Sequence, residues 1–267
     1  ILGDHRKDKT PELMRAMGRF VDQFGGQYVV AEDSGTSVAD IHTMAEVTKH
    51  VGGLADAASM AAGRNGDPSP ATAYGTFVGL KAAVKHRLGR DSLKGLRVAI
   101  QGVGNVGYRL AQHLHEEGAE LWVTDIHFPS VDRAVQAFGA KPVSMEQIFA
   151  LDVDVFSPCA LGAILNDLTL PMIKAPVIAG ASNNQLAAAR HGKVLMERGI
   201  LYAPDYAINA GGIIEIYHET HGYDEAKTKA HLDRIGTVLT QIFERAQAEK
   251  KPTHEIADRM AEEIFRR

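Results

Sequence analysis

The chain has 267 residues, of which 45% are hydrophobic and 23% are charged, so it can bury a sizeable core as one large domain or two ordinary ones. A formal net charge of −4 at pH 7 excludes the basic field that nucleic acid or an anionic membrane attracts, and favours a small-molecule partner. The single Cys159 excludes an internal disulfide, and no run approaches the roughly 18 apolar residues of a membrane span, which favours a reducing, cytoplasmic setting. Because the chain opens with Ile1 rather than Met, we expect an N-terminal portion to precede it.

The first region extends to about residue 70. Apolar residues at helical spacing predict an amphipathic helix over residues 10–24, with Thr10 as its N-cap and Gly25 as its end. A short β-rich run, residues 27–31, follows it and leads into a polar turn over residues 32–37. Polar side chains at the end of a strand often carry function. Glycines and prolines between residues 52 and 70 then predict a loop that joins two domains.

The second region alternates helices and apolar strands. A helix over about residues 71–88 carries Gly75 and Gly79, which predict close packing against a neighbouring element. A strand, a glycine turn, a helix and a second strand then form a βαβ unit, and three further apolar runs follow; the predicted segments are 96–100, 108–117, 120–124, 153–156, 177–179 and 200–202. This alternation predicts an α/β fold with a doubly wound, Rossmann-type parallel sheet.

The remaining chain, from about residue 211, reads as two or three polar helices without a strand. The predicted domains are therefore a substrate-domain remnant over residues 1–70, a nucleotide-binding domain over 71–205, and C-terminal helices over 206–267 that return toward the first domain. The active site is expected in the cleft between the two lobes.

The glycine turn of the βαβ unit matches GxGxxG, from Gly102 to Gly107, directly after a strand and at the start of a helix. Gly102 suits the tight turn, Gly104 lets a pyrophosphate approach the backbone, and Gly107 allows close packing of helix and strand. Asp125 ends the second strand 23 residues after Gly102, where a carboxylate can accept hydrogen bonds from a ribose. This arrangement favours NAD over NADP. Structural turn glycines and a methyltransferase are the alternative interpretations.

Other candidate residues follow strands. Asn183 and Asn184 lie beyond the run 177–180, where amides can orient a ligand, although paired Asn are also ordinary turn residues. Cys159 has no activating His nearby in sequence, which favours a small loop residue beside a cofactor over a nucleophile. Asp33 fits a general acid or base as well as a cap. The scattered His form no metal-binding spacing, so no metal site is predicted.

Six motifs occur in family order along the chain, and together they resemble the glutamate, leucine, phenylalanine and valine dehydrogenases, with the leucine dehydrogenases as the nearest branch. The motifs are Ala31–Thr36, Asp67–Gly75, Gln101–Gly107, Pro158–Gly162, Ala181–Leu186 and Ala203–Gly212. The resemblance implies reversible oxidative deamination, in which an L-amino acid passes a hydride from its α-carbon to the nicotinamide and yields a 2-oxo acid and ammonium.

The resemblance also implies roles for particular residues. Asp33 becomes the catalytic carboxylate that exchanges protons with the substrate nitrogen and the attacking water. Substrate-binding residues are Asn184, which holds the substrate carboxylate, with Ala31, Ile213 and Ile216. Ile213 and Ile216 shape the side-chain pocket and favour an aliphatic substrate. Cofactor-binding residues are Thr72, Gly102, Gly104, Asn105, Val106, Gly107, Asp125, Cys159, Ala160 and Asn183.

One departure from the family concerns two lysines. The family carries a catalytic lysine just before the position of Ile1 and a substrate-binding lysine further upstream. Lys7 and Lys9 lie downstream of those places and are not substitutes. A non-catalytic NAD-binding regulator therefore remains an alternative to the dehydrogenase, as does a glutamate- or phenylalanine-specific member. A homo-oligomer is expected in either case.

Overall fold

The computed structural model describes residues 7–33, 35–54, 60 and 65–266. These divide into two compact units, one of Ile1–Pro68 with Gly212–Ala230 and one of Ser69–Gly211 with His231–Arg267. The C-terminal helices, predicted as one segment over 206–267, are thus shared between the units. The expectations for Ile1 and for part of the 52–70 loop fall outside the described residues.

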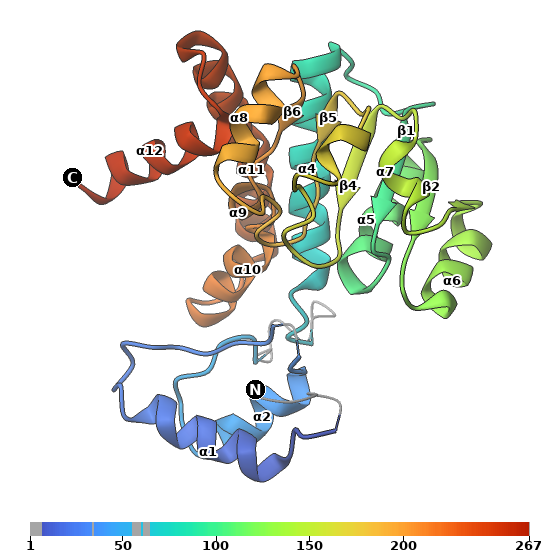
Figure 1. Cartoon of the computed structure of the whole chain (residues 1–267). Coiled ribbons are helices and arrows are strands. Elements are labelled where there is room, and N and C mark those ends of the chain that lie inside the picture. Colours follow the sequence, from blue (N-terminus) through green and yellow to red (C-terminus); the bar gives the residue numbers. More distant parts are fainter. Residues whose placement is uncertain (1–6, 34, 55–59, 61–64, 267) are drawn as a thin grey trace. The chain divides into compact units, whose positions relative to one another are not determined.

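The first unit is built on helices α1 (Pro11–Asp22) and α2 (Val38–Ala45), which pack on each other, with α10 (Gly211–Thr220) following much later in the chain (Figure 1). The predicted N-cap is confirmed, because the side chain of Thr10 accepts a hydrogen bond from the backbone N–H of Leu13. A small core forms around Met14, Ile41 and Met44. The apolar face of the helix predicted over residues 10–24 is therefore buried against α2, which was not predicted from the sequence.

The strand predicted over residues 27–31 is wrong. Only Val30 pairs in this segment, through a single parallel bridge to Val51. A strand needs a partner along its length, and in the described part of the unit no further ladder forms beside it.

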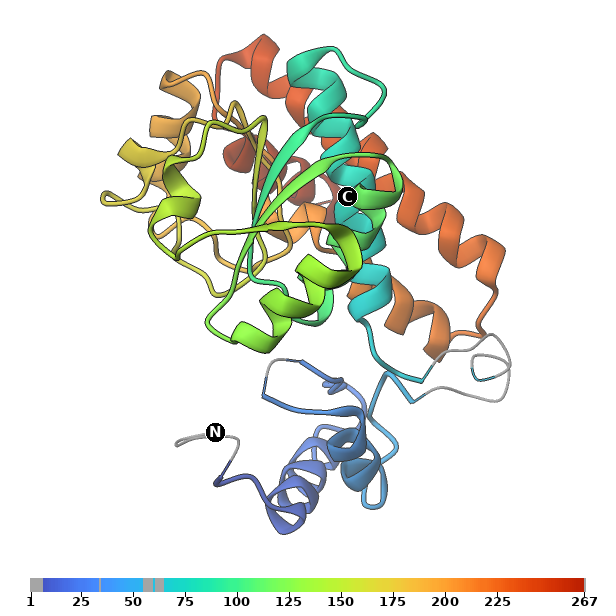
Figure 2. The ribbon, with the colours of Figure 1, turned by 90° about the vertical axis from the view of Figure 1, so that its right-hand side faces the viewer.

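The second unit contains a six-stranded parallel sheet in the order β3-β2-β1-β4-β5-β6 (Figures 1 and 2). The strands are β1 (Arg97–Gln101), β2 (Glu120–Thr124), β3 (Lys141–Pro142), β4 (Val155–Pro158), β5 (Val177–Ile178) and β6 (Leu201–Tyr202). The order reverses beside β1, which is the switch point of a doubly wound sheet. The predicted α/β class and parallel sheet are confirmed, whereas the two-residue β3, polar at Lys141, was not predicted.

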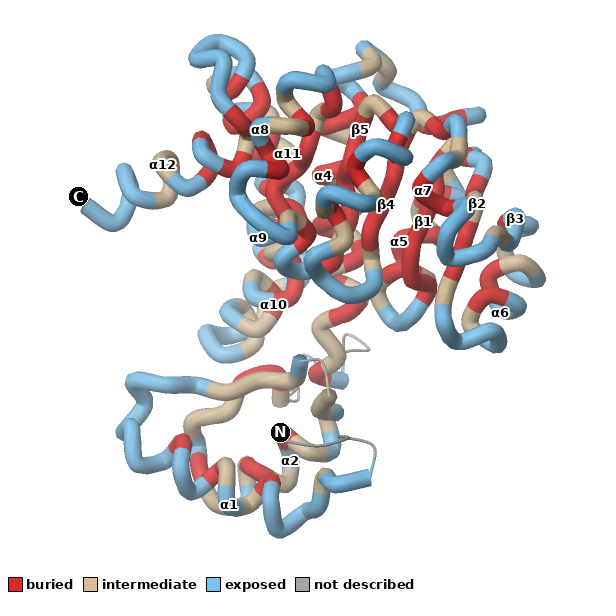
Figure 3. The backbone as a smooth tube through the Cα atoms, in the orientation of Figure 1, coloured by how far each residue is buried: buried red, intermediate tan, exposed pale blue. Residues whose placement is uncertain are grey.

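Helices cover both faces of this sheet. Neighbouring strands place Ala99, Phe156, Ile178 and Tyr202 in one row, which is buried with residues of α7 and α8. On the other face α4 packs against α5 and β5; β4 is buried along its whole length, and β1 is buried after its half-buried first residue, Arg97 (Figure 3). The helices of the unit are α4 (Ser69–Leu88), α5 (Asn105–Glu116), α6 (Phe128–Phe138), α7 (Gln147–Ala150), η1 (Leu170–Met172), α8 (Arg190–Glu197), α9 (Asp205–Ile208), most of α11 (Glu225–Glu249), and α12 (Thr253–Phe265).

The two glycines of α4 lie where neighbouring helices approach it closely. A Cβ on Gly75 would stand 2.6 Å from Ile235 Cδ1, and one on Gly79 would stand 2.6 Å from Ile208 Cγ1. This confirms the close packing predicted for them. Among the described residues no helix is long and apolar enough to cross a membrane.

Candidate nucleotide and substrate site

The glycine turn joins β1 to α5 at the carboxyl end of the central strand. Gly102 has φ +97°, and a Cβ there would stand 2.8 Å from the backbone nitrogen of Ala160. A Cβ on Gly107 would stand 2.0 Å from the carbonyl oxygen of Gly102, so the first turn of α5 lies directly against the strand end. Only glycine satisfies both positions without moving the backbone.

Gly104 differs from its two neighbours because a Cβ there would meet nothing within 4 Å. It is the N-cap of α5, and no side chain of the described residues caps this helix end. The start of α5 thus has no side-chain cap and has open space beside Gly104, and both features suit the binding of a phosphate. The residues present fit the pyrophosphate of a dinucleotide.

Asp125 stands directly after β2 and faces this turn. Its Oδ2 accepts a hydrogen bond from the backbone N–H of Val103 at 2.8 Å, and its Oδ1 accepts one from that of His127 at 2.9 Å. The carboxylate is thereby held beside the glycine turn, within the part of the fold where a ribose follows a pyrophosphate.

The segment after β4 forms the neighbouring wall. The backbone N–H of Cys159 donates to the carbonyl of Gln101 at 2.7 Å, which continues the pairing of β4 with β1. Burial raises the pKa of the Cys159 thiol, so it stays protonated and is a poor nucleophile. Cys159 and Ala160 lie against Gly102, beside the glycine turn.

Asn183 and Asn184 form an exposed turn after β5. Asn184 has φ +52°, a left-handed conformation that Asn tolerates better than most residues. Gly162 allows the turn to approach the segment after β4, because a Cβ on Gly162 would stand 2.6 Å from the carbonyl oxygen of Asn183. Thr72, in the first turn of α4, is half-buried and packs beside Gly211.

Of the predicted catalytic and substrate residues, Asn184 belongs to the second unit, and the others belong to the first: Ala31, Asp33, Ile213 and Ile216. Asp33 is exposed, and its backbone N–H and carbonyl both bond the hydroxyl of Thr36, which closes the turn after Ala31. Ile213 is 68% exposed, whereas Ile216 is half-buried. The shared helical face predicted for the two Ile residues therefore presents one side chain largely to solvent.

Two residues around this part of the first unit, Gly52 and Glu32, were not predicted from the sequence. A Cβ on the buried Gly52 would stand 2.8 Å from Ile216 Cγ2 and 3.9 Å from Ala31 Cβ, so Gly52 makes room between two predicted pocket residues. Partial burial, together with the nearby Asp67 and Asp33, raises the pKa of Glu32. No local pattern distinguishes Gly52 from a loop glycine, because both of its neighbours are distant in sequence.

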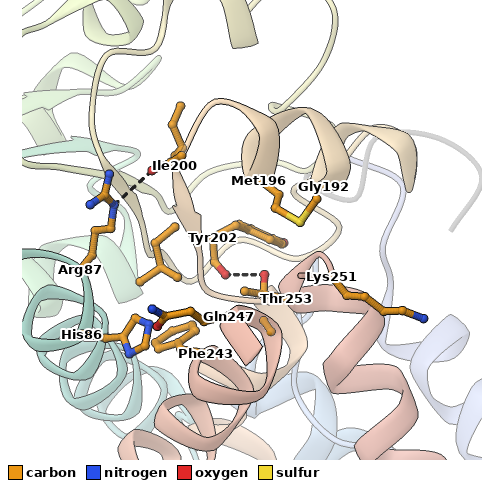
Figure 4. A pocket seen from close by; sticks show the side chains of 13 residues that line it. His86, Arg87, Gly192, Met196, Ile200, Tyr202, Phe243, Gln247, Lys251 and Thr253 are labelled. Carbon is orange, nitrogen blue, oxygen red and sulfur yellow. Dashed lines mark hydrogen bonds between the residues drawn. The ribbon is translucent and has the colours of Figure 1, made fainter. Parts of the chain in front are cut away.

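The second unit also has a pocket of about 310 Å³ around the amino end of β6 (Figure 4). The glycine turn, in contrast, follows the carboxyl end of β1 in the same parallel sheet. Phe243 and Tyr202 supply aromatic walls, and the backbone carbonyl of Gly199 accepts a hydrogen bond from Arg87 Nε at 3.1 Å. Burial lowers the pKa of His86 beside it. In open α/β sheets ligands bind at the carboxyl ends of strands, so the glycine turn and not this pocket is the candidate nucleotide site. In the described part of the chain no three His, Cys, Asp or Glu side chains are grouped to hold a metal ion.

Comparison with known proteins identifies the family. A family model described as Glutamate/Leucine/Phenylalanine/Valine dehydrogenase matches residues 63–127 and 123–263. The chain is 50% identical to a leucine dehydrogenase of Geobacillus stearothermophilus over 263 residues, which are 98% of this chain and 71% of that relative. It is 48% identical to the leucine dehydrogenase of Bacillus subtilis over 267 residues, 100% of this chain and 72% of the relative.

A solved structure agrees with these sequence matches. The L-tryptophan dehydrogenase from Nostoc punctiforme superposes with a TM-score of 0.81 at 42% identity, covering 96% of this chain and 73% of that one. The chain therefore belongs to the glutamate, leucine, phenylalanine and valine dehydrogenase family.

Proposed function

We propose that this protein is an NAD-dependent dehydrogenase that reversibly deaminates a branched-chain L-amino acid, such as leucine or valine, to the 2-oxo acid and ammonium. The observation that carries the proposal is the 46–50% identity to several leucine dehydrogenases over nearly the whole chain. Tryptophan and phenylalanine dehydrogenases match at 40–43%. The membership of the family makes a pyridine nucleotide the cofactor.

Asp33 is the proposed acid–base residue. A carboxylate that alternates between its charged and neutral forms can take a proton from the substrate ammonium and later from the water that attacks the imino carbon. Asn184 holds the substrate carboxylate through its neutral amide, which needs no change of protonation. Bound NAD supplies a nicotinamide that accepts the hydride from the α-carbon.

NAD is the proposed form of the cofactor because of Asp125. Two neutral ribose hydroxyls can donate to its carboxylate, whereas a 2′-phosphate brings about two negative charges toward it. Gly102, Gly104, Asn105, Val106 and Gly107 surround the open start of α5, and we assign the pyrophosphate to them. Thr72 and Asn183 are assigned to the ribose and the nicotinamide amide, with Cys159 and Ala160 lining the cofactor.

The substrate preference follows from aliphatic walls. Ala31, Ile213 and Ile216 carry no polar side-chain atom, so they favour an aliphatic substrate side chain over the carboxylate of glutamate. The residues 213 and 216 belong to α10, and Gly52 keeps the space beside Ile216 open.

To test this proposal, the full-length protein is mixed with NAD and one of L-leucine, L-valine, L-phenylalanine or L-glutamate. The rate of cofactor reduction is measured from the absorbance of the reduced cofactor. We expect leucine and valine to give the highest kcat/KM. Asp33→Asn is expected to lower kcat at least about a hundredfold, with little change in NAD affinity, because proton transfer needs an ionisable group. Asp132→Asn, at an exposed position of α6, is the matched control and keeps full activity. NAD binding without reduction by any amino acid contradicts the proposal and supports a non-catalytic regulator.

We also propose that the protein is cytoplasmic, because its single Cys159 cannot form an internal disulfide in an oxidising compartment. We further propose that it forms a homo-oligomer. Sedimentation of the full-length protein measures the assembly directly. A concentration-independent monomer contradicts this part of the proposal.

A further inference from the structure

A buried glutamine, Gln185, makes hydrogen bonds beside the turn that carries Asn183 and Asn184. Gln185 is 0% exposed, and its Nε2 donates to the carbonyls of Gly180 at 2.8 Å and Ser182 at 3.0 Å. Its own backbone N–H donates to Asp205 Oδ2 at 2.8 Å. These bonds hold the backbone on both sides of the turn, which fixes the positions of the Cα atoms of Asn183 and Asn184.

Helix α9 contacts this turn from both of its ends. Asp205, its first residue, is 7% exposed and receives the backbone N–H of Gln185. Asn209, directly after its last turn, donates from Nδ2 to the carbonyl of Ala181 at 3.1 Å and to Asn183 Oδ1 at 2.5 Å. Asn209 therefore bonds both the backbone before the turn, at Ala181, and the side chain of Asn183 within it.

The two bonds of Asn209 set the direction of the Asn183 amide. The carbonyl of Ala181 can only accept, so the Asn209 group that faces it must be the NH2. The same NH2 faces Asn183, so Asn183 must present its oxygen there. This leaves the NH2 of Asn183 for the opposite side, and no acceptor among the described residues bonds it. The amide thus offers donors to whatever binds at the turn.

We propose that Asn209 is a positioning residue for the cofactor site: it orients the Asn183 amide so that its NH2 donates to an acceptor oxygen of the bound nicotinamide nucleotide. This rests on the proposed function, in which Asn183 contacts the cofactor. Asn209 touches neither the cofactor nor the substrate in this scheme and acts only through Asn183. The site therefore favours a ligand that places a hydrogen-bond acceptor at the NH2 group of Asn183, and it disfavours one that places only donors there.

A double-mutant cycle on NAD affinity tests the proposal. Asn209→Ala is expected to weaken NAD binding about three- to tenfold, as the loss of one oriented neutral hydrogen bond does. In the Asn183→Ala background the same substitution is expected to have no further effect, because the group that it orients is gone. Gln247→Ala removes an exposed amide at the other end of the strands and is the matched control, with unchanged NAD affinity.

Heteronuclear NMR provides a second readout that does not depend on NAD. The side-chain NH2 signals of Asn183, assigned by their loss in Asn183→Ala, are expected to shift and broaden in Asn209→Ala. Urea unfolding of each variant shows whether it is folded. Additive effects in the cycle, or unchanged Asn183 signals in a folded Asn209→Ala, overturn the proposal. If Asn183→Ala itself binds NAD as the unmodified protein does, the assignment of Asn183 to the cofactor fails, and the NMR result still decides whether Asn209 orients it.

Discussion

The guanidinium of Arg133 lies over the ring of Tyr108, 3.9 Å from its centroid. Tyr108 belongs to α5, which follows β1, and Arg133 belongs to α6, which follows β2. Arg133 is the first Lys or Arg after Asp125 in sequence, and stacking on the aromatic ring engages it in a cation–π contact. Its packing has consequences for the choice between NAD and NADP.

We expect NAD to bind at least about tenfold more tightly than NADP. Unit like charges 4 Å apart repel by roughly 4 kcal/mol at an effective dielectric of about 20, and a third of that already gives tenfold. Asp125→Ser should erode the preference by weakening NAD and relieving NADP. Arg133→Ala should leave NADP affinity unchanged. Titration of each cofactor without substrate measures this, and equal or tighter binding of NADP to the unmodified chain would refute the role of Asp125.

The turn glycines should separate stability from binding. Gly107→Ala places a Cβ 2.0 Å from the carbonyl oxygen of Gly102, and we expect it to lower the free energy of unfolding by about 1–3 kcal/mol or more. Gly104→Ala meets no protein atom within 4 Å, so stability should change little while NAD affinity falls, because the methyl group occupies the space proposed for the pyrophosphate. Urea unfolding and NAD titration of both variants distinguish the two effects. Intact stability of Gly107→Ala would contradict the close packing.

Gly52→Ala should alter substrate preference. The added methyl group would lie 2.8 Å from Ile216 Cγ2 and 3.9 Å from Ala31 Cβ, so it takes volume beside two proposed pocket residues. We expect the kcat/KM ratio to move about three- to tenfold toward valine from leucine, since one methylene discriminates by about 10-fold or more in a rigid pocket. KM for NAD serves as the internal control. An unchanged ratio in a folded variant would remove Ile216 and Ala31 from the side-chain pocket.

The loss of folding stability in acid should depend in part on Asp167. Hydrogen bonds from Arg190 at 2.7 and 2.6 Å, and a contact with His191, lower the pKa of Asp167 from 3.8 to about 2. Because the folded pKa is the lower one, the ionised carboxylate stabilises the fold above about pH 4, and this contribution is lost as the pH falls toward 2. Asp167→Asn should lower the urea midpoint slightly at pH 7 and less at pH 3. Asp132→Asn is the control without this dependence, and a midpoint difference that grows in acid would contradict the assignment.

Local sequence determined the nucleotide-binding half of this protein. The strand, glycine turn, helix and second strand around Gly102 are neighbours in the chain, and the predicted strand over residues 120–124 coincides with β2. Turn geometry and the alternation of apolar segments depend on residues close together in the chain. These elements can therefore be predicted without knowing the rest of the fold. The family motifs, read in order, likewise identified the chemistry expected of the chain.

Tertiary structure decided what depends on partners distant in sequence. The run at residues 27–31 has the composition of a strand, yet it forms one bridge, because pairing requires a second segment alongside it. Gly52 meets Ile216, and Asn209 meets Asn183, across 164 and 26 residues respectively. Likewise, residues 212–230 join the first unit while 231–267 join the second. Side-chain burial and hydrogen bonds of this kind arise only when the chain has folded, because their energy comes from groups that no local pattern brings together.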